Sequence, residues 1–132
     1  MRYYIAQRST QAFEHTLERV RKALSEEGFG VLTEIDVTAT LKKKLDVDFR
    51  NYRILGACNP PFAYQALQAE DKIGTMLPCN VVVQQVSAEE VEVAAIDPLA
   101  SMQAVDNPAL KSIAEAVREK LAKVVDRATV DQ

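Results

Sequence analysis

The stretch FEHTLERVRKALSEEGFGVLTEIDV, residues 13–37, decides the fold because it contains a helix, its end and the next strand. Four apolar residues recur at spacings of four, three and four, as on one side of a helix: Phe13, Leu17, Val20 and Leu24. Gly28 predicts the helix end, since glycine takes the left-handed cap conformation without strain, and Phe29 would then contact Leu24. Ser9 or Thr10 is expected to cap the first turn.

Residues 30–37 then alternate in character, which predicts a strand. One face of this strand would carry Val31, Thr33, Ile35 and Val37. The other face would carry Glu34 and Asp36.

Helix and strand patterns are also found in the rest of the chain. Strands are predicted at residues 3–7, 52–58, 79–86 and 91–96, the last two joined by a hairpin turn at 87–90. Short helices are predicted at 38–45 and from Asn59-Pro60 to about residue 69, and a second long helix at 108–125, with a polar tail that frays.

These elements predict one α+β domain over residues 1–132, because two long amphipathic helices need a shared apolar surface to cover. The sheet would be mostly antiparallel, with both long helices on one face and short helices inserted between strands. The opposite face would be open to water, a ligand or a second copy.

Composition excludes several classes of protein. The net charge is −3, the pI is about 5.2 and only 6% of residues are aromatic, so neither nucleic acid nor an anionic membrane is an expected partner. The N-terminus lacks the apolar core of a signal peptide, and no apolar run approaches the ~20 residues that span a bilayer. With two cysteines and no disulfide-scaffold spacing, a cytoplasmic location is expected.

Two Cys-Asn dipeptides, Cys58-Asn59 and Cys79-Asn80, are the main candidate binding site. One ends the third predicted strand and the other begins the fourth, so antiparallel pairing would bring the thiols to one edge of the sheet. The helix start after Cys58 would favour its thiolate. The pair could form a reversible disulfide, bind a soft metal or hold one nucleophile, whereas the alternative is that both thiols simply pack. Both asparagines could equally serve as helix or turn caps, the role we favour for Asn59.

Other polar residues give weaker signals. Glu34, Asp36 and Asp97 could form an acidic cluster for acid-base chemistry or a hard cation, although a solvated strand face is the favoured interpretation. We likewise interpret Lys42–Lys44 as part of a solvated helix face. His15 falls off the apolar stripe and is expected to face solvent, which makes it a poor catalytic base.

Four segments together resemble the signature blocks of domain-of-unknown-function family 302: EGFGVLTEID at 27–36, ILGACNP at 54–60, LPCNV at 77–81 and IDP at 96–98. The resemblance implies a TATA-box-binding-protein-like fold, with an antiparallel sheet backed by two long helices, and a homodimer from bacteria or archaea. It implies no activity.

Three hypotheses follow for the function. The leading one is a dimeric module that binds a small ligand or metal, or senses redox state, near Cys58 and Cys79. The second is an enzyme that uses Cys58 as a thiolate nucleophile. The third is a structural or interaction protein in which the cysteines only pack. The sequence identifies no cofactor, no metal and no catalytic residue.

Overall fold

The computed structural model describes residues 2–130 and contains one five-stranded sheet in the order β1-β5-β4-β3-β2. Every neighbouring pair of strands is antiparallel, so the α+β prediction is confirmed. The strands are β1 (Tyr4–Ser9), β2 (Gly30–Asp36), β3 (Tyr52–Cys58), β4 (Cys79–Gln85) and β5 (Val91–Ile96).

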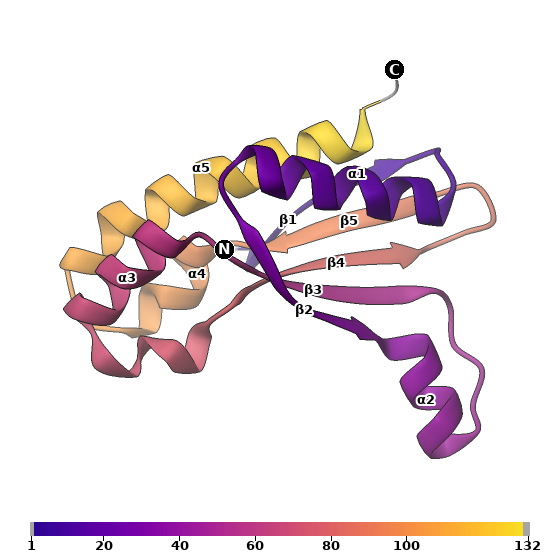
Figure 1. The fold of residues 1–132 in the computed structure, drawn as a ribbon, viewed down its shortest axis with the longest axis horizontal. Coiled ribbons are helices and arrows are strands. Elements are labelled where there is room, and N and C mark those ends of the chain that lie inside the picture. Colours follow the sequence, from indigo (N-terminus) through magenta and orange to yellow (C-terminus); the bar gives the residue numbers. More distant parts are fainter. Residues whose placement is uncertain (1, 131–132) are drawn as a thin grey trace.

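The two long helices, α1 (Phe13–Glu26) and α5 (Ala109–Thr129), lie side by side on one face of the sheet (Figure 1). Between them and the sheet is a core of fully buried side chains that includes Leu17, Leu24, Leu55, Val83 and Leu121. The shorter segments are α2 (Val37–Leu45), α3 (Pro60–Ala69) and the 3-10 turn η1 (Asp71–Met76), which connect strands, and α4 (Pro98–Ser101) and the 3-10 turn η2 (Met102–Ala104), which connect β5 to α5. No helix in the described part of the chain is both long and apolar enough to cross a membrane.

The end of α1 confirms the predicted glycine cap. Gly28 has φ +85°, and the amide of Phe29 donates to the carbonyl of Leu24 at 2.9 Å, the bond that defines a Schellman cap. The predicted start is wrong, because Ala12 precedes the first turn and no side chain caps it. The Ser9 hydroxyl instead accepts from the backbone amide of Gln11 and from the Thr16 hydroxyl.

Helix α5 is longer than predicted, because the segment after Val125 is not a polar tail. Ala128 and Thr129 are buried, and the Thr129 hydroxyl donates to the Val125 carbonyl at 2.8 Å. These contacts extend the helix to Thr129, four residues into the stretch expected to fray.

Strand β2 departs from simple alternation because of a β-bulge between Val31 and Thr33. Its register places Glu34 opposite Leu55, on the helix-bearing face, and Val31 opposite Ala57 on that same face. The prediction that Val31 and Glu34 lie on opposite faces is therefore wrong. The extra residue in the bulge moves Val31 to the other side of the strand.

Residues 30–49, called the arm below, form the most exposed part of the fold. The arm comprises β2, α2 and the loop that follows, and α2 has no buried residue. Its exposed apolar side chains include Leu32, Ile35, Leu45, Val47 and Phe49. In Figure 1 α2 projects from the β2 edge, away from α1 and α5.

Candidate functional site

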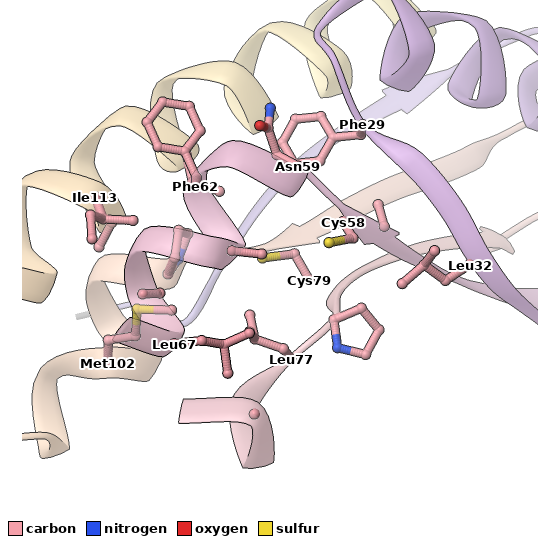
Figure 2. A pocket seen from close by; sticks show the side chains of 18 residues that line it. Phe29, Leu32, Cys58, Asn59, Phe62, Leu67, Leu77, Cys79, Met102 and Ile113 are labelled. Atoms are coloured by element: carbon pink, nitrogen blue, oxygen red, sulfur yellow. The ribbon is translucent and has the colours of Figure 1, made fainter. Parts of the chain in front are cut away.

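An apolar cavity of about 290 Å³ lies where the end of β3 and the start of β4 meet α3 and α5. Its walls come from four regions of the chain, and none of the lining residues is charged. Figure 2 shows the site, with the sulfur atoms of Cys58 and Cys79 next to each other in the lining. The lining residues that Figure 2 labels are Phe29, Leu32, Cys58, Asn59, Phe62, Leu67, Leu77, Cys79, Met102 and Ile113.

The strand register explains why both cysteines lie at the same end of the sheet. Ala57 pairs with Cys79, so Cys58 comes one position beyond the last pair, where β3 gives way to α3. Both thiols are free: Cys79 is buried, whereas Cys58 is partly exposed. The structure thus brings the two cysteines together, as expected from antiparallel pairing of their strands.

The environment of Cys79 makes it a poor nucleophile. Burial, with a smaller contribution from the nearby Cys58, raises the pKa of the Cys79 thiol to about 11. At neutral pH it is protonated and acts as a small apolar wall residue. Cys58 is therefore the thiol that outside reagents can reach.

The two asparagines separate in the structure. Asn59 lines the cavity, and its side-chain amide donates to the carbonyl of Glu27 at 3.3 Å, which ties the start of α3 to the end of α1. Its predicted capping role is wrong in detail, because it occupies the cap position of α3 without a side-chain capping bond. Asn80 is exposed and lies opposite Gly56, away from the cavity lining.

The acidic cluster considered as a possibility does not form, because Asp97 follows β5 whereas Glu34 and Asp36 lie on β2 at the far edge of the sheet. Glu34 accepts from Arg53 at 2.9 Å and also from Arg21, and Arg53 further pairs with Asp36. Burial would raise the pKa of Glu34, but the hydrogen bonds from the two arginines outweigh burial and lower it. Glu34 is therefore a paired anion that holds the edge strand to α1.

Asp97 lies near the other edge, after β5. It is buried, accepts from the Leu99 amide at 3.0 Å as the cap of α4, and pairs with Arg118 at 3.0 Å. Within residues 2–130 no group of three or more His, Cys, Asp and Glu side chains is placed to hold a metal ion. His15 is exposed on α1, as predicted, and does not line the cavity.

Most of the cavity lining was missed by sequence reasoning. Leu32 is the clearest case: as the residue between the two pairs flanking the bulge, it lies at the cavity rim with 65% of its surface exposed. A usable signal was the segment PPFAYQALQA of α3, which is largely apolar although only Ala66 in it is buried. An apolar helix that the core does not absorb indicates a second apolar surface.

Comparison with known proteins agrees with this architecture. The family model for the domain of unknown function DUF302 matches residues 5–128, which is nearly the whole chain. The chain belongs to the DUF302 family. A search of curated proteins gave no match.

This DUF302 protein is also similar to a solved structure, an uncharacterized conserved DUF302 protein from Bacillus stearothermophilus. The two share 32% sequence identity, with a TM-score of 0.90 over 97% of this chain and 99% of the other. The resemblance seen in the Cys-Asn segments is thus confirmed as family membership. The family description assigns no activity, so the function must be argued from the site.

Proposed function

We propose that this DUF302 protein binds a small, largely apolar molecule in the cavity beside Cys58 and Cys79. The observation that carries the proposal is an uncharged cavity of about 290 Å³, in which Asn59 is the one polar side chain besides the thiols. Ligand sites are typically apolar concavities of ~300–1,000 Å³ with few polar groups, and a dry cavity of ~150 Å³ already accommodates benzene.

Binding has more support than the other roles considered for the two cysteines. Catalysis by Cys58 would need a base or an activating charge, and no carboxylate, imidazole or amine from residues 2–130 lines the cavity. Soft-metal binding or redox sensing would depend on the two thiols alone, and Cys79 resists ionisation. Only ligand binding uses the whole cavity.

Filling the cavity should abolish binding. The probe is N-phenyl-1-naphthylamine, an uncharged dye that fluoresces in apolar surroundings. Ala63 lines the cavity and is only partly buried, so Ala63→Phe adds a ring to the cavity without disturbing the core. We expect probe affinity to fall at least about tenfold, since the probe loses apolar contacts worth more than ~1.4 kcal/mol.

The matched control is Gln65→Phe, which adds the same ring to the exposed side of the same helix. Its probe affinity should stay within about twofold of the native value. Urea unfolding of both variants would show that they are folded. Equal binding by native protein and the Ala63 variant, or no binding by either, would refute the proposal.

We further propose that the protein is a homodimer formed through the arm. The supporting observation is that exposed apolar side chains there have no cover, including Leu32, Leu45 and Val47. A two-fold interface places a patch against itself, so it suits a surface with both charge signs. The arm carries Lys42–Lys44 beside Asp46 and Asp48.

Placing a charge in the arm should weaken this dimer. Leu45 is 66% exposed, so Leu45→Asp should leave monomer stability unchanged while raising the dimer dissociation constant at least about tenfold. Sedimentation at two concentrations measures this, with Gln68→Asp on exposed α3 as the control. A native protein that is monomeric at both concentrations would refute the proposed dimer.

We also propose a reducing compartment such as the cytoplasm, because both cysteines are free. If reduced thiols are alkylated in intact cells before lysis, Cys58 should then be recovered in the alkylated form. Recovery of Cys58 mainly in oxidised form would contradict this.

A further inference from the structure

A second apolar hollow of about 370 Å³ adjoins the cavity. It lies between α4, η2 and the first turns of α5, and it is lined by Leu99, Met102, Gln103, Val105, Asn107, Leu110, Lys111 and Ala114. Met102 and Ala114 line both spaces and so form the wall between them. In Figure 2 Met102 and Ile113 lie at one end of the lining and Leu32 lies at the other.

One side of this wall is the flexible side chain of Met102. Methionine has three rotatable bonds and fills irregular gaps in several conformations, and Met102 sits on the short 3-10 turn η2 rather than in a long element. A turn of its side chain would join the two hollows into one elongated apolar space. Ala114 on α5 forms the fixed side of the passage.

The second hollow differs from the cavity in having a charge. Lys111 is exposed on the first turn of α5, and it is the one charged residue among those that line the two spaces. Within residues 2–130 it forms none of the ion pairs of the structure. An unpaired cation at the outer end of an apolar space is complementary to an anionic head group on an apolar chain.

We infer that the ligand is a medium-chain fatty acid, whose chain runs from the cavity past Met102 into the second hollow and whose carboxylate lies at Lys111. The inference rests on the proposed function and assigns its ligand class. The two hollows joined have about four times the ~150 Å³ that holds benzene, which is room for a ten-carbon chain that reaches Lys111. The thiols would contact the chain, not the head group.

The test is displacement of N-phenyl-1-naphthylamine by decanoic acid and by 1-decanol, both below micelle-forming concentrations. Decanoate should compete more strongly than decanol in the native protein. Lys111→Glu should weaken decanoate about tenfold, as expected for a lost exposed pair plus repulsion, while decanol and the probe bind as before. The control is Lys123→Glu, which makes the same charge change at an exposed position on α5 away from both hollows.

The outcomes separate this inference from the proposed function. If the probe binds and decanol competes as well as decanoate, or if Lys111→Glu and Lys123→Glu behave alike, the fatty-acid assignment is wrong while the cavity remains a ligand site. If neither the probe nor either competitor binds, both proposals are overturned.

Discussion

Replacing Gly56 with alanine is expected to lower the free energy of unfolding by about 2 kcal/mol, the usual cost of forcing an atom into a packed site. A Cβ at Gly56 would lie 2.3 Å from the Thr33 hydroxyl oxygen and 2.8 Å from Cγ of Pro78. The threonine side chain can rotate away, but the proline ring cannot. Because Pro78 precedes Cys79 and lines the cavity, the substitution should also weaken probe binding.

The control for this loss is Gly30→Ala. Gly30 pairs with Cys58 on the neighbouring strand, and nothing lies within 4 Å of a Cβ built there. Urea unfolding should show little change for Gly30→Ala and partial recovery when Thr33→Ala is added to Gly56→Ala. A Gly56→Ala variant as stable as native protein would show that the contact with Pro78 relaxes freely.

Raising the pH from 9 to 11 is expected to destabilise the protein through Cys79 by about 2 kcal/mol. The pKa of this thiol is about 11 in the folded protein, against an ordinary value of 9.0. Below pH 9 both states hold the proton, so the stability is fully present. Between pH 9 and 11 the Cys79 thiol loses its proton more readily in the unfolded chain. The free energy of unfolding therefore falls as the pH rises through the folded pKa.

Comparison with Cys79→Ala isolates this effect, because lysines and tyrosines titrate equally in both proteins. The stability difference between native protein and variant, measured by urea unfolding at pH 8 to 11, should shrink by about 2 kcal/mol across the range. Cys58→Ala should keep most of the pH dependence, since burial is the larger cause of the shift and Cys58 the smaller one. An unchanged difference across the range would mean that Cys79 is not shielded from water.

The sequence was sufficient for the fold because its decisive signals are local. The apolar stripe of α1, the glycine at Gly28 and the β-branched residues of β4 each depend on neighbours within a few residues. The convergence of Cys58 and Cys79 could also be predicted, since short connections between consecutive strands favour antiparallel pairing.

The cavity itself could not be predicted, because it depends on segments far apart in the chain. Its walls join Phe29, Phe62, Met102 and Val117, and no local pattern indicates that side chains from these segments leave a space between them. The bulge that leaves Leu32 at the cavity rim could not be predicted either. A regular alternation of side chains along a strand does not indicate where an extra residue is inserted.

The possible acidic cluster was excluded for a topological reason. Glu34 and Asp97 follow the same kind of strand pattern in sequence, but β2 lies at one edge of the sheet and β5 lies three strands away. Their partners, Arg21 and Arg118, come from helices whose placement the sequence does not give. The distinction between a solvated strand face and a paired anion therefore needed the structure.

The most direct test of the cavity as a ligand site is a nuclear Overhauser measurement between bound N-phenyl-1-naphthylamine and the methyl groups of the protein. We expect contacts from the aromatic protons of the probe to the methyls of Ala63, Ala66 and Met102, all of which line the cavity. Contacts to the exposed methyls of Leu45 and Val47 on the arm, with none in the cavity, would contradict this expectation.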